Sequence, residues 1–358
     1  MAERLKDMFF TRDSMGIFAD NILEVYPVFD KPRFLDFVFD ETFFDKELKE
    51  RMSHTTLCLK EILPEPFPEA LEILLKAAPK VRGFEAMSIP DYVSVYGMEY
   101  WDISLPAIGR ITRYITCEFA IRPFLDKDPG KVLPYLLEWA ENESHHVRRL
   151  ASEGSRPRLP WAMALPKFKK DPHPILPILE KLKEDESETV RRSVANNLND
   201  ISKDNPGIAL KVCREWYGHS EETDKIVKHA CRTMLKAGHK DALMIFGYGD
   251  PSSISIENFH LEESSINIGD DLRFSFDVVF EKKCKARLEY GVSYVKSNGK
   301  LSSKVFKITE GSYKPGTYSF KRKQSFADMS TRKHYPGKHQ ISLLLNGEEK
   351  AQTSFELK

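Results

Sequence analysis

The sequence contains a repeat with a period of 43 residues, and no other feature constrains its fold as strongly. One copy, VLPYLLEWAENESHHVRRLAS, begins at Val132, and the next, ILPILEKLKEDESETVRRSVA, begins at Ile175. Leu-Pro, Glu-Ser and Val-Arg-Arg occupy matching positions in both. A further copy fits loosely from Ala209, and ITRYITCEFAIRP, starting at Ile111, resembles VRRLASEGSRP. A unit of about 40 residues is typical of arrays built from pairs of helices.

The rest of the first 250 residues also has helical spacing. Residues 48, 52, 56, 59 and 62 fall on one face of a helix, and residues 69–78 are good helix formers that end at Pro79. Pro134 and Pro177 are expected at the first position of their helices, which tolerates the missing N–H. We therefore predict a HEAT-like helical solenoid over residues 1–248, in which equivalent repeat positions line the concave face.

Beyond Gly247 the period of the apolar residues changes to two. Every second residue is apolar from 272 to 280 and again from 286 to 294, and GYGDPSS is a plausible linker. Asn298-Gly299 and Asn346-Gly347 are typical hairpin turns. About seven short strands fit in this region, which is the size of an immunoglobulin-like β-sandwich. We predict such a domain over residues 249–358, without the Cys…Trp…Cys spacing of the disulfide-bonded form.

The composition indicates a cytoplasmic protein. Five scattered cysteines include no CxxC, which favours a reducing compartment over a disulfide framework or a zinc site. The start of the chain, MAERLKDMFF, lacks the apolar core of a signal peptide, and no run approaches the roughly 18 apolar residues of a membrane span. We expect no contact with a membrane.

Charge is distributed unevenly along this formally neutral chain. Residues 1–250 carry 36 basic and 41 acidic side chains, whereas residues 251–358 carry 18 and 13. Between 281 and 340 there are 15 basic residues and 4 acidic ones. Because local patches rather than totals steer a polyanion, a neutral protein with such regions can bind nucleic acid.

One carboxylate stands out because it lies among cations. The run from Arg148 to Lys170 holds seven basic residues and a single acidic one, Glu153. The cations would bind a polyanion, whereas a carboxylate among them weakens such binding. Glu153 is therefore either an ion-pair partner or a functional group of the site. Glu118 lies at the equivalent position upstream, in TCEFAIRPFL, which we predict to be an apolar helix. Asp200, after VRRSVANNLN, can reach the same concave groove from the next repeat.

Each carboxylate also has a structural interpretation. Glu118 could pair with Arg113 or Arg122, the latter at the favourable i+4 spacing. Glu153 could pair with a neighbouring arginine at 149, 156 or 158, and Asp200 could serve a helix end or turn. Because the two glutamates occupy equivalent repeat positions, it is less probable that both are only structural ion-pair partners.

The cations and one tryptophan complete the candidate site. Arginines and lysines recur where second helices begin and in the loop that follows, a setting that binds phosphates. We expect part of this set to be structural, namely the second arginine of each Val-Arg-Arg. Trp161 is either core or an aromatic contact for a cationic base or a sugar; Trp139 and Trp216 are predicted to be core. His145 and His146 have no neighbouring ligands that would make a metal site.

No Walker A, GxGxxG, HExxH or GxSxG motif occurs in a suitable context, which removes the usual nucleotide, zinc-protease and serine-hydrolase classes. TCEFAIRPFL, VRRLASEGSRPRLPWA and VRRSVANNLNDISKDNP, in this order and followed by a sandwich-like domain, resemble the AlkC family of DNA alkylation repair glycosylases. This family is related to AlkD within a HEAT-like superfamily, and the resemblance covers nearly the whole chain.

The resemblance implies a monofunctional DNA-3-methyladenine glycosylase type of enzyme in base excision repair. It would remove 3-methyladenine and 3-methylcytosine from double-stranded DNA as a monomer, without a cofactor, a metal or an obligate protein partner, and in association with the nucleoid. The family's carboxylates carry over to Glu118, Glu153 and Asp200, and its aromatic contact to Trp161. For the DNA backbone we expect a set of six cations: Arg148, Arg156, Arg158, Lys169, Lys170 and Arg191. The alternative is a non-enzymatic HEAT-repeat module that binds DNA or serves as a protein scaffold.

Overall fold

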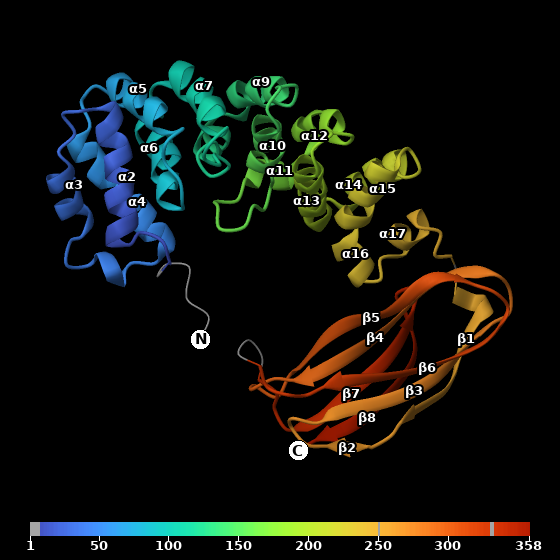
Figure 1. Ribbon diagram of the computed structural model, residues 1–358. Helices are drawn as coiled ribbons and strands as arrows, with labels where there is room; N and C mark the ends of the chain where they lie inside the picture. The colour runs from blue at the N-terminus through green and yellow to red at the C-terminus, as the bar shows by residue number, and fades with distance from the viewer. Residues whose placement is uncertain (1–7, 250, 330–332) are drawn as a thin grey trace. The chain divides into compact units, whose positions relative to one another are not determined.

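The computed structural model describes residues 8–249, 251–329 and 333–358, and these form two compact units (Figure 1). The first comprises the chain up to Ala209 together with Gly218–Ala230. The second comprises Leu210–Tyr217 together with Cys231–Lys358. The described part of the chain contains no helix that is long and apolar enough to cross a membrane.

The first unit is an array of short helices that follow one another in chain order along an arc (Figure 1). Its elements are α2 (Arg12–Val25), α3 (Lys31–Val38), η1 (Phe43–Asp45), α4 (Leu48–Ile62), α5 (Phe67–Ala77), η2 (Glu85–Met87), α6 (Ser88–Tyr96), α7 (Trp101–Ile111), α8 (Arg122–Lys127), α9 (Pro129–Trp139), α10 (His145–Gly154), α11 (Pro166–Lys170), η3 (His173–Ile175), α12 (Leu176–Leu182), α13 (Glu188–Asp204) and α15 (Glu221–Ala230).

The helices predicted near the N-terminus are present. α4 begins with a capping box between Glu47 and Glu50, and it buries Met52, Thr56 and Leu59 on one face, as the spacing predicts. α5 ends at Ala77, directly before the segment that contains the helix-breaking Pro79.

The 43-residue repeat corresponds to pairs of helices, α9 with α10 and α12 with α13. The second helices form a continuous row, because α10 packs against α13 and α13 packs against α15. The repeat-equivalent Val147 and Val190 are both buried, so the matching positions serve the same packing role. Pro177 lies in the first turn of α12 as expected, but Pro134 lies inside α9. The prediction for Pro134 was wrong because Pro129 takes the first position of that helix.

The segment that carries Glu118 is a turn, which corrects the prediction of a helix there. It connects α7 to α8 and spans the residues between Ile111 and Arg122. Pro123 occupies the first turn of α8, where its missing N–H costs nothing. In the interior of a longer helix the same proline would remove a hydrogen bond and clash with the preceding turn. The chain therefore restarts a helix at this point.

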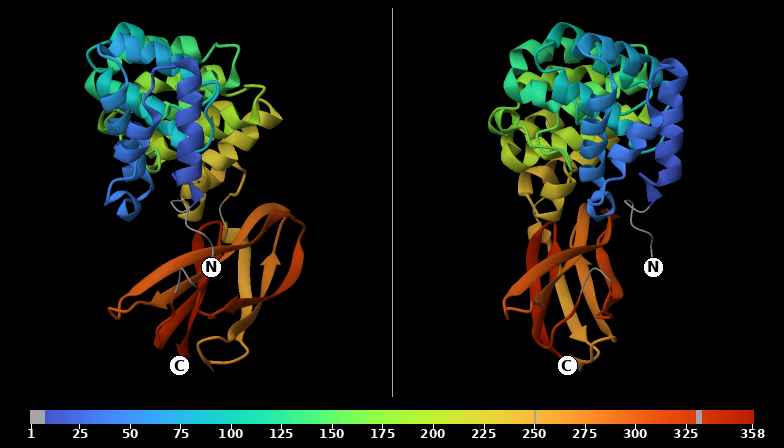
Figure 2. Two further views of the ribbon diagram at one scale, coloured as in Figure 1. Left: turned by 60° about the vertical axis from the view of Figure 1, so that its left-hand side comes forward. Right: turned by 90° about the vertical axis from the view of Figure 1, so that its left-hand side faces the viewer.

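The second unit is a β-sandwich with short helices before it. Its elements are part of α14 (Pro206–Trp216), α16 (Arg232–Lys236), α17 (Lys240–Ile245), η4 (Pro251–Ser253), β1 (Ile254–Leu261), β2 (Ser265–Ile266), β3 (Asp271–Phe280), β4 (Cys284–Val295), β5 (Leu301–Tyr313), β6 (Gly316–Ser325), β7 (Gly337–Leu345) and β8 (Glu348–Leu357). One sheet has the order β1-β3-β6 and the other β2-β8-β7-β4-β5. Figure 2 shows the strands as two facing layers.

The alternating apolar residues form the core between the two sheets. Those of β3 at 272, 274, 276, 278 and 280 are all buried, and those of β4 from 286 to 292 join the same cluster. β4 also buries the charged pair Arg287 and Glu289, with Nη2 2.7 Å from Oε1. Asn346 and Gly347 both have positive φ and join β7 to β8, as predicted. The described residues contain eight strands where about seven were expected, and β2 is the shortest.

Candidate active site in the helical unit

The three predicted carboxylates lie in one network that two arginines connect. Arg149 Nη2 lies 3.5 Å from Glu118 Oε1 and 3.8 Å from Glu153 Oε1. Arg156 Nη1 lies 2.7 Å from Glu153 Oε1, and its Nε lies 2.9 Å from Asp200 Oδ2. Side chains from a turn, from α10 and from α13 therefore converge, although they are up to 82 positions apart in the sequence.

Glu153 and Asp200 are the buried members of this network. Glu153 is 7% exposed and also accepts a hydrogen bond from Ser193 Oγ at 2.6 Å. Asp200 is 1% exposed, lies inside α13 rather than in a turn, and accepts from Lys203 Nζ at 2.9 Å. Burial alone would lower the pKa of Arg156, but the charges of these two carboxylates outweigh burial and raise that pKa.

Glu118 differs from the other two carboxylates because one of its oxygens is unpaired. Oε1 faces Arg149, whereas Oε2 is enclosed and has no hydrogen-bond partner among the described residues. Glu118 lines a cavity of about 500 Å³ together with Tyr114, Phe119 and Trp161. A carboxylate oxygen without a partner, next to aromatic rings, can accept a proton or stabilise a cation.

Trp161 is an exposed residue of the loop between α10 and α11. Its side chain is 60% exposed and lines the same cavity as Glu118, which excludes the alternative of a core tryptophan. Trp139 and Trp216 are buried, as predicted. Trp161 has a φ of 66°, a left-handed conformation that a bulky residue adopts only under constraint.

The buried Arg122 supports this loop from beneath. Its Nε donates to the carbonyl of Met163 at 2.7 Å, and its Nη1 donates to the carbonyls of Gly154 at 3.0 Å and Arg156 at 2.8 Å. Burial, with a smaller contribution from the charge of Arg156, lowers the pKa of Arg122 to about 10. Arg122 is thus a structural residue and does not pair with Glu118, contrary to one of the interpretations of the sequence.

The first arginine of each Val-Arg-Arg is the structural one, which corrects the expectation that the second would be. Arg148 binds both carboxylate oxygens of Asp185, at 2.6 and 3.0 Å, and two backbone carbonyls. Arg191 donates to the carbonyls of Asp185 and Glu186. Both reach back to the loop before their own helix.

The remaining predicted cations differ in how far they are available to a ligand. Arg156 is buried in the carboxylate network. Arg158 forms two hydrogen bonds with Asp204, at 2.7 and 2.6 Å, although its side chain is 39% exposed. Lys169 is partly exposed and Lys170 is exposed.

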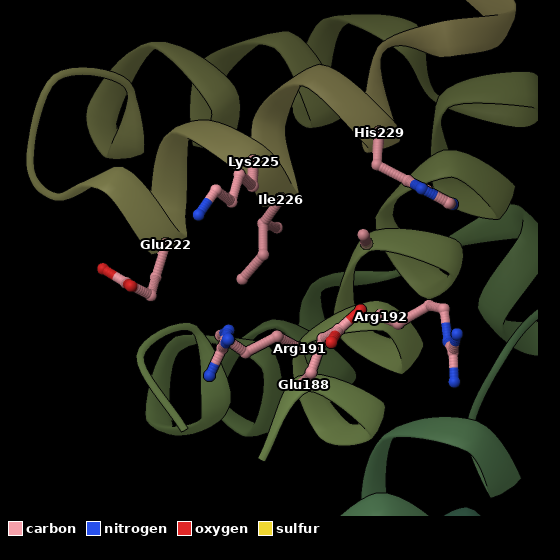
Figure 3. A pocket seen from close by; sticks show the side chains of 8 residues that line it. Glu188, Arg191, Arg192, Glu222, Lys225, Ile226 and His229 are labelled. Carbon is pink, nitrogen blue, oxygen red and sulfur yellow. The ribbon is translucent and has the colours of Figure 1, made fainter. Parts of the chain in front are cut away.

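Arg192 lines a second cavity, of about 370 Å³, between α13 and α15 (Figure 3). Arg191, Lys225 and His229 line it as well, together with Glu188, and Ile226 lies on its apolar side. Arg192 is the repeat equivalent of Arg149, yet it has no hydrogen bond or ion pair within the described residues. The repeat register could have singled out Arg149 and Arg192 for the groove, but the sequence did not reveal which arginine of each pair turns inward.

The described residues include no group of three or more His, Cys, Asp or Glu side chains that could hold a metal ion.

Known protein families and structures match both the helical part and the β-sandwich of this chain. The model of the C-terminal Ig-like domain of the protein YhaZ matches residues 255–358, and the HEAT repeat model matches residues 175–204. YhaZ of Bacillus subtilis (strain 168) is 49% identical over 333 residues, which are 93% of each protein. The structure of Pseudomonas fluorescens alkylpurine DNA glycosylase AlkC, bound to DNA containing an abasic site analog, is 36% identical. The match covers 99% of this chain and 100% of that one with a TM-score of 0.93.

The fold is thus that of a HEAT-like repeat protein with a C-terminal Ig-like domain. The chain belongs to the AlkC family, in agreement with the resemblance of its sequence motifs.

Proposed function

We propose that this protein is a DNA glycosylase of alkylation repair that excises the N3-methylated bases 3-methyladenine and 3-methylcytosine. The relationship to an alkylpurine DNA glycosylase solved with DNA supports the reaction class. The observation that carries the proposal is the position of Glu118. It lines an aromatic cavity with Trp161, and its buried Oε2 has no hydrogen-bond partner among the described residues. Its Oε1 is connected to Glu153 and Asp200 through Arg149 and Arg156.

The chemistry needs carboxylates more than it needs an acid. An adenine or cytosine methylated at N3 is cationic, so it leaves as a neutral base when the bond between its nitrogen and C1′ of the deoxyribose breaks. Positive charge then develops on the sugar, and water adds to C1′ while losing a proton. A fixed negative charge stabilises the oxocarbenium-like transition state, and a carboxylate with an available oxygen accepts the proton, as in glycosidases.

The three carboxylates divide this work according to their surroundings. Glu118 acts as the general base, since it lines the cavity and its Oε2 has no hydrogen-bond partner among the described residues. Glu153 and Asp200 are held in place by Arg156 and supply a fixed negative potential. The indole of Trp161 contacts the cationic base or its sugar, because the face of an aromatic ring attracts a cation.

The DNA backbone is bound by cations whose charge is not already paired with other groups of the protein. Arg192 and Lys170 fit this role, and Arg158 does so if a phosphate replaces Asp204. Arg148, Arg156 and Arg191 instead hold the groove in shape through internal contacts. The substrate is double-stranded DNA with an alkylated base, and the enzyme acts as a monofunctional hydrolase and as a monomer.

Release of free base from methylated duplex DNA tests the proposal. The full chain is expected to liberate 3-methyladenine and 3-methylcytosine, detected by mass spectrometry, and to leave abasic sites. Glu118→Gln is expected to slow single-turnover release by about 10²-fold or more with nearly unchanged DNA affinity, because a general base is lost. Glu141→Gln is the matched control, since Glu141 pairs with Lys181 on the surface. If the wild-type chain releases no base, the proposal is wrong; if Glu118→Gln retains full activity, only its role as base is wrong.

A further inference from the structure

We propose that Lys49, which lies 112 positions before Trp161 in the sequence, is the positioning residue that holds Trp161 at the edge of the cavity. The effect on base release rests on the proposed function, whereas the placement of the indole can be tested without it. Lys49 lies in the first turn of α4, outside the repeat and the three family motifs.

Trp161 needs an external constraint to keep its conformation. Its φ of 66° belongs to the left-handed region, which costs a non-glycine residue of the order of 1–3 kcal/mol and persists only when neighbouring structure enforces it. The indole cannot supply that constraint by packing, because the side chain is 60% exposed. Within the loop, the backbone hydrogen bonds from Ala162 to Leu159 and from Leu165 to Pro157 are 3.3 and 3.1 Å long and do not involve Trp161 itself.

Lys49 supplies a contact at the peptide that follows the strained dihedral. Its Nζ donates to the carbonyl oxygen of Trp161 at 2.7 Å, the length of a strong charge-assisted hydrogen bond. The same ammonium lies 5.5 Å from the centroid of the Phe119 ring, within the range of a cation–π contact. Phe119 follows Glu118 directly, and all three residues Glu118, Phe119 and Trp161 line one cavity. One ammonium thus connects the tryptophan side of the cavity with the glutamate side.

Arg122 and Lys49 act on different parts of the loop. Arg122 is fully buried and binds the carbonyls that flank the tip, at 154, 156 and 163. Lys49 is exposed and binds the carbonyl of Trp161 itself. Loss of Arg122 therefore removes support from the whole loop, whereas loss of Lys49 leaves the loop folded and releases only the orientation of the indole.

Fluorine NMR on protein labelled with 5-fluorotryptophan tests the placement directly. The chain has four tryptophans, and Trp161→Phe assigns the resonance in question. Lys49→Met keeps the length of the side chain and removes the charge, so it is expected to shift or broaden the Trp161 signal and leave the other three unchanged. Lys49→Arg is expected to restore the signal. Lys60→Met is the matched control, since Lys60 lies on the same helix and pairs with Glu65. An unchanged Trp161 signal in Lys49→Met would overturn the proposal.

A double-mutant cycle tests the consequence for the reaction. Lys49→Met is expected to slow single-turnover base release by about 10-fold, because small misplacements of a positioning group have effects of this size or more. In a Trp161→Ala background the same change is expected to have little further effect. A loss of DNA affinity with a shallower salt dependence, and no effect on the rate at saturating DNA, would instead make Lys49 a phosphate contact and overturn the proposal. If the wild-type chain proves inactive, the proposed function fails while the NMR result still decides the role of Lys49.

Discussion

Ion pairs inside the protein determine which charged residues of the groove can still bind a ligand. Arg156 lies between Glu153 and Asp200, and each of the two carboxylates has a further donor, Ser193 for the one and Lys203 for the other. Such buried pairs are costly to break, since the remaining charge is left without a partner. Glu118 and Arg192 differ from these residues. Within the described part of the chain, one oxygen of Glu118 and the guanidinium of Arg192 have no partner.

At this scale we predict that Arg192 contacts a DNA phosphate. Arg192→Gln is expected to weaken binding to duplex DNA and to reduce the slope of log affinity against log salt by about 1, because each phosphate contact releases about one counterion. The rate of base release at saturating DNA should stay the same. Fluorescence anisotropy over a series of salt concentrations measures the slope. Lys181→Gln is the control, since Lys181 lies on α12 and pairs with Glu141. An unaltered slope in Arg192→Gln would assign the cavity between α13 and α15 to something other than DNA.

At the scale of elements, hydrogen bonds from several side chains hold the loop between α10 and α11. Arg122 binds its backbone from beneath, Lys49 binds its tip, and Arg158 connects it to Asp204 at the end of α13. The loop itself has little regular structure, so its shape depends on these side chains.

Arg122 is expected to contribute most to the stability of this loop. Arg122→Met should lower the free energy of unfolding by about 3 kcal/mol or more, because three carbonyls, two of them in buried hydrogen bonds, lose their donor. Arg122→Lys should not restore it, since one ammonium cannot reproduce the spread of a guanidinium. Urea denaturation followed by circular dichroism measures the difference. Full stability of Arg122→Lys would show that charge rather than geometry is what the loop requires.

The ion pair between Arg158 and Asp204 should make stability depend on pH. The hydrogen bond from Arg158 lowers the pKa of Asp204 below its ordinary value of 3.8. Because the folded-state pKa is the lower one, the stabilisation is present above about pH 4 and is lost as the pH falls through the folded-state pKa. Arg158→Gln is therefore expected to be less stable than wild type near neutral pH, by an amount that shrinks in acid. Urea midpoints at several pH values test this; a constant difference at every pH would contradict it.

At the scale of the whole molecule, the second unit includes helical residues as well as the sandwich. Gly238 and Gly347 touch through their backbones, so that a Cβ on Gly347 would lie 2.3 Å from the Cα of Gly238. Lys285 Nζ donates to the carbonyl of Phe246, and Asn346 Nδ2 to that of Gly249. Residues 231–249 therefore pack with the strands. The predicted domain boundary after residue 248 rests on the change in the period of the apolar residues. It stays a prediction.

Substitutions at two hairpin glycines distinguish the effect of the contact between Gly347 and Gly238 from the effect of backbone strain. Gly347 and Gly299 have similar φ values, 76° and 73°, but Gly299 has nothing within 4 Å of a built Cβ. Gly299→Ala is expected to cost about 1 kcal/mol through its positive φ alone. Gly347→Ala should cost about 2 kcal/mol more, because overpacking against backbone cannot relax easily. Thermal unfolding of the two variants gives the comparison, and equal losses would mean that the turn can move away from Gly238.

The amino-acid sequence by itself determined the two kinds of architecture, and it singled out three carboxylates as candidates for the site. A period of 43 residues with helical spacing, followed by a period of two, predicts helix pairs and then a sandwich, because local periodicity follows from which faces must be buried. The predicted repeat equivalence of Glu118 and Glu153 was wrong, since Glu118 lies in a turn and Glu153 in α10. The resemblance of motifs led to the family.

Only the tertiary structure decided which groups are paired and which are available. The partner of Arg156 at position 200 and the partner of Arg148 at position 185 lie 44 and 37 residues away, and nothing in local spacing selects them. The unpaired oxygen of Glu118, the exposed indole of Trp161 and the contact from Lys49 depend in the same way on chain segments that meet only after folding. Electrostatic pairing depends on distances in space, and these are set by how the helices pack rather than by the order of the residues.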